Sequence, residues 1–175
     1  VMAETKYING PQVKQFEDAV ARYLGVKHAI GVASGTDALW IALRAVGVGP
    51  ETEVITTSFS FFATAGTIAN LGATPVFVDI EADTFNLTAE QIEQRITPRT
   101  RAIVPVHLFG QSADLDPIMA LAKKHKIAVV EDAAQSLSSK YKNQMSGTIG
   151  DLGIYSFYPT KNLGCPGDGG LITTN

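Results

Sequence analysis

The sequence predicts a three-layer α/β/α fold, in which a mostly parallel sheet of seven strands lies between two layers of helices. Short apolar runs alternate along the chain with stretches of helical spacing, and most of the intervals between runs are long enough for a crossover helix. Such alternation requires parallel strands that are covered on both faces. The chain has 175 residues and is 45% hydrophobic, which is sufficient for one buried core, so we expect a single domain over residues 1–175.

The first predicted element is a helix over residues 11–24. Gly10 and Pro11 open it, and Gly25 offers a C-terminal cap. Its apolar positions fall on one face: Val13, Phe16, Val20, Tyr23 and Leu24.

Seven apolar runs are predicted to be strands: Ala29–Ala33, Val54–Ser58, Pro75–Ile80, Ala102–Val106, Ile127–Glu131, Leu152–Phe157 and Gly170–Thr173. The interval Leu163–Gly170 is too short and too rich in glycine for a crossover helix, so the last strand is expected to run antiparallel. Polar turn residues in Ser138–Met145 predict a surface hairpin.

Four further helices are predicted between the strands. Two cover Thr36–Val46 and Phe61–Leu71. A third is opened by a capping box in Thr88–Gln91, and a fourth has Asp116 as its N-cap and Pro117 at its first position.

Composition excludes several classes of protein. The chain carries 14 basic and 17 acidic residues, a net charge of −3, without a run of like charges, so we expect no nucleic-acid partner. Cys165 is the only cysteine, and no spacing of His, Cys or carboxylates predicts a metal site. No apolar stretch is long enough to span a membrane, and Val1–Lys6 lacks the apolar region of a signal peptide. These features predict a cytoplasmic protein without a membrane partner.

A lysine and an aspartate carry the candidate chemistry. Asp132 stands at the polar end of the apolar run that begins at Ile127, and Lys161 lies in the loop after the aromatic strand Leu152–Phe157. In a parallel sheet, ligands bind beyond the carboxyl ends of strands. Together the two residues can hold pyridoxal phosphate, with the lysine as a Schiff base and the carboxylate against the pyridine nitrogen. Glu131 points to the opposite face of its strand, so only Asp132 is assigned to this site.

Each candidate also has a simpler interpretation. Asp132 could cap a helix, and Lys161 could be one of the solvated surface lysines. Phe61 could lie against the ring of the cofactor, or Phe59, Phe61 and Phe62 could be ordinary core. A hydrogen-bonded core residue is the simpler interpretation of His107, which is kept as a secondary site candidate.

The turn Ser34–Thr36 precedes a predicted helix, whose free N–H groups could bind a phosphate. Alternatively, Ser34 or Thr36 only caps the helix. A P-loop is excluded because Gly35 is followed by Thr36-Asp37 rather than by Lys-Ser or Lys-Thr.

Five motifs in order resemble the DegT/DnrJ/EryC1/StrS family of sugar aminotransferases: Ser34–Leu39, Ser58–Thr64, Pro105–Gly110, Glu131–Gln135 and Ser156–Gly164. The resemblance extends over essentially the whole chain and implies the large domain of a fold type I aminotransferase. It implies the following roles: Lys161 bonds covalently to pyridoxal phosphate, Asp132 contacts the pyridine nitrogen, Gln135 the 3-oxygen, Phe61 stacks on the ring, and Gly35, Thr36 and Ser156 hold the phosphate. Ser34, in the turn before the helix, is counted with them as a cofactor-binding residue.

Members of this family transfer an amino group, usually from glutamate, to a keto group of a nucleotide-linked sugar, in the biosynthesis of polysaccharide or antibiotic sugars. They act as homodimers. A dehydrating branch carries histidine at the lysine position, so Lys161 favours amino transfer. The resemblance therefore implies the two substrates and a second copy of the chain as partners.

Two alternatives remain open. Family members are longer, so the C-terminal small domain is expected to be absent, and the chain could be a catalytically incomplete fragment or a shortened homologue that folds or assembles without turnover. It could also be a nucleotide-binding α/β domain without pyridoxal chemistry, although no G-x-G-x-x-G follows the first strand.

Overall fold

The computed structural model describes residue 5 and residues 8–175. The expectation for Val1–Lys6 therefore lies outside the described residues, except at Thr5. No helix within the described part of the chain is long and apolar enough to cross a membrane.

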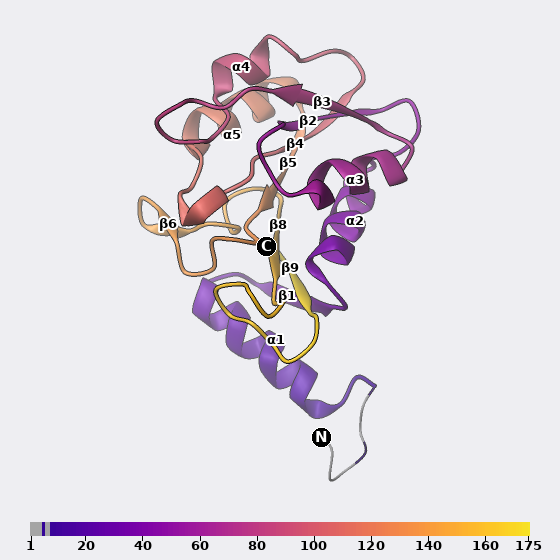
Figure 1. Ribbon diagram of the computed structural model, residues 1–175, viewed down its shortest axis with the longest axis vertical. Helices are drawn as coiled ribbons and strands as arrows, with labels where there is room; N and C mark the ends of the chain where they lie inside the picture. Colours follow the sequence, from indigo (N-terminus) through magenta and orange to yellow (C-terminus); the bar gives the residue numbers. More distant parts are fainter. Residues whose placement is uncertain (1–4, 6–7) are drawn as a thin grey trace.

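A seven-stranded sheet forms the middle layer and confirms the predicted fold class (Figure 1). All seven predicted strands are present, with ends that differ by at most two residues from the prediction. In chain order they are β1 (His28–Val32), β2 (Glu53–Thr57), β3 (Thr74–Val78), β4 (Thr100–Val104), β5 (Ala128–Asp132), β8 (Leu152–Ser156) and β9 (Gly170–Thr174). Their order across the sheet is β1-β9-β8-β5-β4-β2-β3.

Strand directions bring the loops of six strands to one edge of the sheet. The pairs β2–β3, β2–β4, β4–β5 and β5–β8 are parallel. Strand β9 runs antiparallel to both β8 and β1, as predicted, and so β1 points the same way as β8. The carboxyl ends of β1, β8, β5, β4, β2 and β3 therefore share one edge, which is where ligands bind in such sheets.

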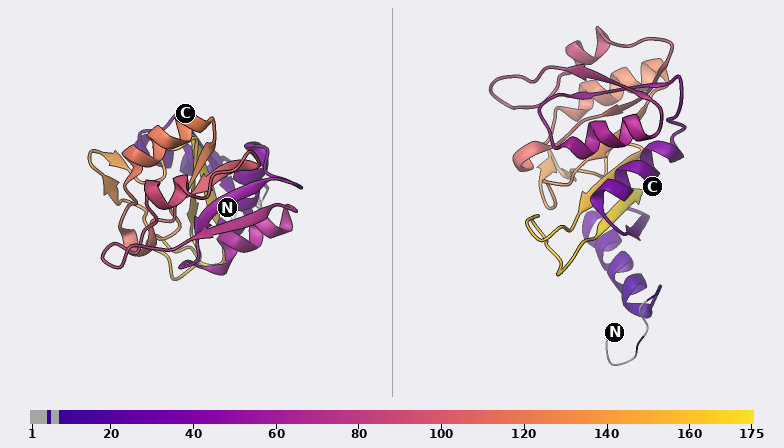
Figure 2. Two further views of the ribbon diagram at one scale, coloured as in Figure 1. Left: turned by 90° about the horizontal axis from the view of Figure 1, so that it is seen from above. Right: turned by 45° about the vertical axis from the view of Figure 1, so that its right-hand side comes forward.

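Helices cover both faces, and the alternation of side chains along the strands decides which helix faces which residues. Helices α2 (Gly35–Ala45) and α3 (Phe62–Asn70) pack against one set of core residues, which includes Val130 and Ile154. Val129 and Tyr155, which are adjacent to Val130 and Ile154 in the sequence, belong to the opposite face. Helices α1 (Pro11–Leu24), α4 (Ala89–Glu93) and α5 (Leu115–His125) cover that face. Figure 2 shows the two layers from further directions. Two residues that are adjacent in a strand thus pack against different helix layers.

The predicted helix ends are mostly confirmed, with one correction. Helix α1 has the predicted bounds and ends at Gly25 with φ of 75°, and α4 begins with the capping box of Thr88 and Gln91. The N-cap of α5 is Asp114, however, and not Asp116, so Pro117 is the third residue of the helix rather than the first. Proline is tolerated there because the N–H groups of the first turn have no acceptor inside the helix.

The surface hairpin explains why α5 begins early. Its strands are β6 (Lys140–Tyr141) and β7 (Gln144–Met145). The hydroxyl of Tyr141 donates to the Asp114 carboxylate and accepts a hydrogen bond from the backbone N–H of Asp116 at 3.3 Å. A tyrosine from the hairpin therefore provides the cap that the Asp114 side chain does not provide.

A tight crossing fixes the loop between β7 and β8 on the sheet. Residues 146–150 cross β8 at Gly153, where a Cβ atom would overlap the carbonyl oxygen of Gly147. The hydroxyl of Thr173 on β9 donates to the same oxygen at 2.6 Å. Only glycine at position 153 leaves room for this crossing.

We expect Gly153→Ala to lower the free energy of unfolding by at least about 3 kcal/mol, because the methyl group overpacks a rigid backbone contact. Gly31→Ala is the matched control, since it is also a strand glycine and its nearest neighbour would lie at an ordinary 3.5 Å. Urea unfolding monitored by circular dichroism measures both variants. Equal stabilities of the two variants would contradict the assignment of the crossing.

Candidate active site

Asp132 is a buried carboxylate at the carboxyl end of β5, on the face that α2 and α3 cover. Its side chain is held by two donors: the hydroxyl of Thr64 donates to Oδ2 at 2.8 Å, and the backbone N–H of Ala134 donates to Oδ1 at 3.2 Å. Burial raises the pKa of Asp132 above its usual range, while these two bonds and the charge of Lys161 act in the opposite direction. The carboxylate is thus oriented, and Lys161 is close enough to influence it.

Glu131 points to the opposite face, as the strand alternation predicts. It is fully buried and accepts four hydrogen bonds: from Nε2 of His107 at 2.9 Å and from the backbone N–H groups of Gly147 at 2.7 Å, Ile149 at 2.6 Å and Gly150 at 2.6 Å. Burial raises the pKa of this carboxyl, but the bonds from His107 and the backbone outweigh burial and hold the pKa below its ordinary value. Glu131 therefore fastens the loop over residues 146–150 to the back of the sheet.

Of the two interpretations of His107, a core residue or a site residue, the structure supports the hydrogen-bonded core residue. Its side chain is fully buried, and Nδ1 accepts a hydrogen bond from the backbone N–H of Ala113 at 3.1 Å. Because Nδ1 is an acceptor, Nε2 carries the ring proton and donates it to Glu131. Its ring therefore belongs to the Glu131 network on the face opposite to the Asp132 side chain.

Lys161 stands in a compact loop after β8. Its backbone N–H donates to the carbonyl oxygen of Tyr158 at 2.8 Å, which closes a turn. The side chain is half-buried, and Nζ lies 5.9 Å from the centroid of the Phe61 ring. The amine is therefore directed toward an aromatic face rather than into open solvent.

Phe61 is not core. Its side chain is 71% exposed, at the N-cap position of α3, and Phe59 and Phe62 are also exposed. The interpretation of these three residues as ordinary core is therefore wrong. Phe59 instead stacks against Phe85, with the ring centroids 5.7 Å apart, whereas Phe61 presents its ring to Lys161.

The N-terminus of α2 lies against the end of β8. A Cβ atom on Gly35 would come within 2.6 Å of Cβ of Ser156, so the two residues are in close contact. The first-turn N–H groups of Gly35 and Thr36 have no acceptor within the helix, which makes this end suitable for an anion. Ser34 is the N-cap: its Oγ accepts from the N–H of Asp37 at 3.0 Å and donates to that side chain at 2.8 Å. The cap uses the Ser34 hydroxyl, so Gly35, Thr36 and Ser156 are better phosphate candidates.

Gln135 lies three residues beyond Asp132 and is half-buried. The backbone carbonyl oxygen of Gln135 would be 3.7 Å from a Cβ atom on Gly110, so Gln135 lies beside the loop after β4. Thr64 contacts Asp132 in the candidate site, and sequence reasoning did not identify it. Its hydroxyl position within the first turn of a helix gives no sign of a partner 68 residues away in the sequence.

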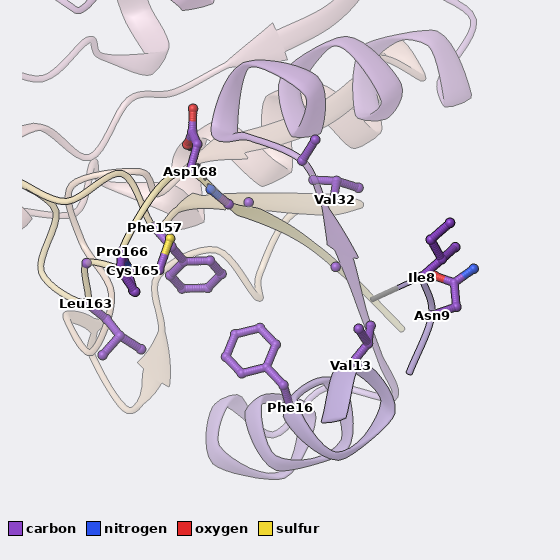
Figure 3. Close-up of a pocket in the computed structure, with 15 residues that line it drawn as sticks. Ile8, Asn9, Val13, Phe16, Val32, Phe157, Leu163, Cys165, Pro166 and Asp168 are labelled. Carbon is purple, nitrogen blue, oxygen red and sulfur yellow. Dashed lines mark hydrogen bonds between the residues drawn. The ribbon is translucent and has the colours of Figure 1, made fainter. Parts of the chain in front are cut away.

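A separate hollow of about 870 Å³ lies beneath the loop that follows Lys161 (Figure 3). Val13 and Phe16 of α1 line one side, and Phe157, Leu163 and Cys165 line the other. The rings of Phe16 and Phe157 meet edge to face, with centroids 5.3 Å apart. Neither Lys161 nor Asp132 lines this hollow, so it is distinct from the candidate site.

Comparison with known proteins places the chain in a family. The DegT/DnrJ/EryC1/StrS aminotransferase family matches residues 1–175, and the chain belongs to it. A protein of Pseudomonas aeruginosa named UDP-2-acetamido-2-deoxy-3-oxo-D-glucuronate aminotransferase is 51% identical over 175 residues, which are 100% of this chain and 49% of that protein. A protein of Geobacillus stearothermophilus named pleiotropic regulatory protein is 54% identical over 100% of this chain and 47% of its own length.

The fold agrees with that of a solved relative. The crystal structure of a DegT/DnrJ/EryC1/StrS aminotransferase from Brucella abortus matches with a TM-score of 0.97 and 47% identity, over 100% of this chain and 49% of that one. The chain therefore spans about half the length of the relatives that it matches.

We expect Glu131→Gln to lower the free energy of unfolding at pH 7 by about 3 kcal/mol or more, because the amide would face three backbone donors inside the protein. Since the pKa of Glu131 is lowered from 4.5, its contribution to stability is complete above that value and is lost as the pH falls through the folded-state pKa. The difference in free energy of unfolding between wild type and Glu131→Gln should therefore shrink below about pH 4. Urea unfolding at a series of pH values measures this difference.

Glu90→Gln, at an exposed position in the first turn of α4, is the control and should change stability by less than about 1 kcal/mol. A Glu131→Gln variant as stable as this control at pH 7 would contradict the ionised, hydrogen-bonded state assigned to Glu131.

Proposed function

We propose that residues 1–175 are the pyridoxal phosphate-binding large domain of an aminotransferase that moves an amino group from glutamate to a keto group of a nucleotide-linked sugar. Membership of the aminotransferase family supports the type of reaction. The name of the Pseudomonas aeruginosa relative, a transaminase of a UDP-linked oxo sugar acid, supports the class of acceptor. The family name and the site together favour this function over a nucleotide-binding domain without pyridoxal chemistry.

The observation that carries the proposal is the convergence of three groups from separate elements. The amine of Lys161 comes from the loop after β8, the Phe61 ring from the start of α3, and the Asp132 carboxylate from the end of β5. Lys161 Nζ lies 5.9 Å from the Phe61 ring centroid, and the charge of Lys161 acts on the Asp132 carboxyl. An amine, a flat aromatic face and a buried carboxylate are the groups that a pyridoxal ring requires.

The phosphate also has a suitable receptor. The N-terminus of α2 provides the N–H groups of Gly35 and Thr36 together with the positive end of the helix dipole. Ser156 adds a hydroxyl from β8, and Gly35 must lack a side chain to lie this close to it. The residues present therefore fit the cofactor at both its ring and its phosphate.

When bound, pyridoxal phosphate supplies an electron sink for the carbanion at the substrate α-carbon. Asp132 accepts a hydrogen bond from the ring nitrogen and stabilises its protonated state. Nζ of Lys161 would hold the cofactor covalently and, as a free amine, would carry a proton from the α-carbon of the amino donor to the cofactor. Gln135 contacts the 3-oxygen, and Phe61 fixes the plane of the ring.

A homodimer is part of the same proposal. Phe59, Phe85 and Phe109 follow three different strands, β2, β3 and β4, and form one exposed aromatic group at the edge of the sheet that holds the site. Exposed apolar groups of this kind are common at protein interfaces. Their position supports a partner copy that covers this edge.

The proposal is tested with pyridoxal phosphate and glutamate. We expect the purified protein to gain a visible absorbance band with pyridoxal phosphate, and glutamate to bleach it in a single turnover, because the amino group moves to the cofactor. Borohydride should fix the cofactor covalently on the peptide that contains Lys161. Lys161→Ala should abolish the band and the labelling.

Lys142→Ala is the matched control, since Lys142 is an exposed lysine of the hairpin that pairs with Asp116, and it should leave both readouts unchanged. An unlabelled Lys161 peptide in wild type, or labelling that persists in Lys161→Ala, would refute the proposed function.

A further inference from the structure

Building on the proposed function, we propose that Thr64 is a positioning residue, whose hydroxyl holds the Asp132 carboxylate in the orientation and charge state that the ring nitrogen of the cofactor requires. Thr64 is the third residue of α3 and is 2% exposed. Helix α3 begins directly after Phe61, the residue assigned to the face of the ring. One short segment thus fixes both the ring wall and the carboxylate.

The geometry of the carboxylate supports this role. Each oxygen of Asp132 has one donor: Thr64 Oγ1 binds Oδ2 at 2.8 Å, and the N–H of Ala134 binds Oδ1 at 3.2 Å. Two donors on different oxygens prevent rotation of the group, because either rotation breaks a bond. A carboxylate has about four lone-pair positions, so each oxygen can still accept a further hydrogen bond, including one from a ring N–H.

Thr64 does not behave as a threonine in a helix usually does. The hydroxyl of Thr67, one turn later, returns to its own helix and donates to the carbonyl oxygens of Ala63 at 2.8 Å and Thr64 at 3.1 Å. Thr64 instead donates across the interface between α3 and β5. Its single proton goes to Asp132, so Ser60 is the donor in the 3.5 Å contact between the hydroxyls of Ser60 and Thr64. The hydroxyl of Thr64 therefore serves Asp132 rather than the helix.

The environment of Asp132 makes this donor important. Burial disfavours the ionised carboxyl, and the bond from Thr64 is the first of the effects that oppose burial, ahead of the Ala134 N–H and the charge of Lys161. Without Thr64, Asp132 should be ionised over a narrower range of pH, and fewer molecules would present a charged partner to the ring nitrogen.

The decisive variant is Thr64→Val, which replaces the hydroxyl by a methyl group of similar size. We expect the dissociation constant of pyridoxal phosphate, measured by absorbance titration of the intact protein, to rise by about 10- to 100-fold, the range for loss of a hydrogen bond to a charged group. In the cofactor-free protein, the carboxyl carbon of Asp132 followed by NMR should titrate at a higher pH than in wild type.

Thr67→Val is the matched control: it is the same substitution, in the same helix, at an equally buried position, and it should shift neither readout. Thr64→Ser, which keeps the hydroxyl, should restore the affinity to within about 3-fold of wild type. If Thr64→Val does not fold, Thr64→Ala can be compared with Thr64→Ser. The first variant lacks the hydroxyl and the second keeps it, so the comparison tests the same interaction.

The outcomes separate the two proposals. Wild-type protein that fails to bind pyridoxal phosphate overturns the proposed function, together with the part of this inference that concerns the ring. A wild type that binds normally, with Thr64→Val and Thr67→Val alike in affinity and in the titration of Asp132, overturns the role of Thr64 alone. A selective effect of Thr64→Val that Thr64→Ser reverses supports it.

Discussion

The end of β5 must take two consecutive carboxylates out of water, and most of the site follows from how it does so. Strand alternation sends Glu131 and Asp132 to opposite faces, so each needs its own hydrogen-bond donors to compensate for the loss of water. Glu131 receives it from a neutral histidine and three backbone N–H groups, which is enough to keep a buried carboxylate ionised. Asp132 receives fewer donors and remains the carboxylate with capacity for a ligand.

This asymmetry distinguishes a carboxylate that only holds the fold together from the one proposed to bind the cofactor. The groups around Glu131 are all from the chain itself, and they close the loop 146–150 over Gly153 on the side that α1 and α5 cover. Those around Asp132 leave its oxygens only partly used, at the edge of the sheet where the loops of six strands meet. A buried charge that is incompletely paired is costly, so such a group is expected where a cationic partner completes the pairing; in the proposed site, that partner is a protonated ring nitrogen.

The sequence predicted the strands because these depend on local patterns, whereas the assignment of Asp132 and Lys161 to a cofactor site stays a prediction. Apolar runs and their spacing identified all seven strands, and the short glycine-rich interval before β9 identified its antiparallel direction. The N-cap of α5 was missed because Tyr141, which caps it, comes from a hairpin 25 residues later. Thr64 was missed for a similar reason, since its partner lies in another strand. Local signals specify elements, whereas contacts between distant elements decide which hydroxyl or carboxylate meets which partner.

The phosphate end of the proposed site depends on close packing rather than on a motif. Helix α2 must approach the sheet closely enough for its first N–H groups to lie beside Ser156. Two glycines permit this approach: a Cβ on Gly35 would come within 2.6 Å of Cβ of Ser156, and one on Gly170 would come within 2.8 Å of the amide nitrogen of Gly35. Gly170 begins β9, the antiparallel strand between β1 and β8. By separating β1 from β8, that strand places the helix that follows β1 over the end of β8, next to the loop that carries Lys161. The antiparallel strand, although it ends at the opposite edge, therefore sets the spacing between the N-terminus of α2, which is proposed to bind the phosphate, and the amine of Lys161.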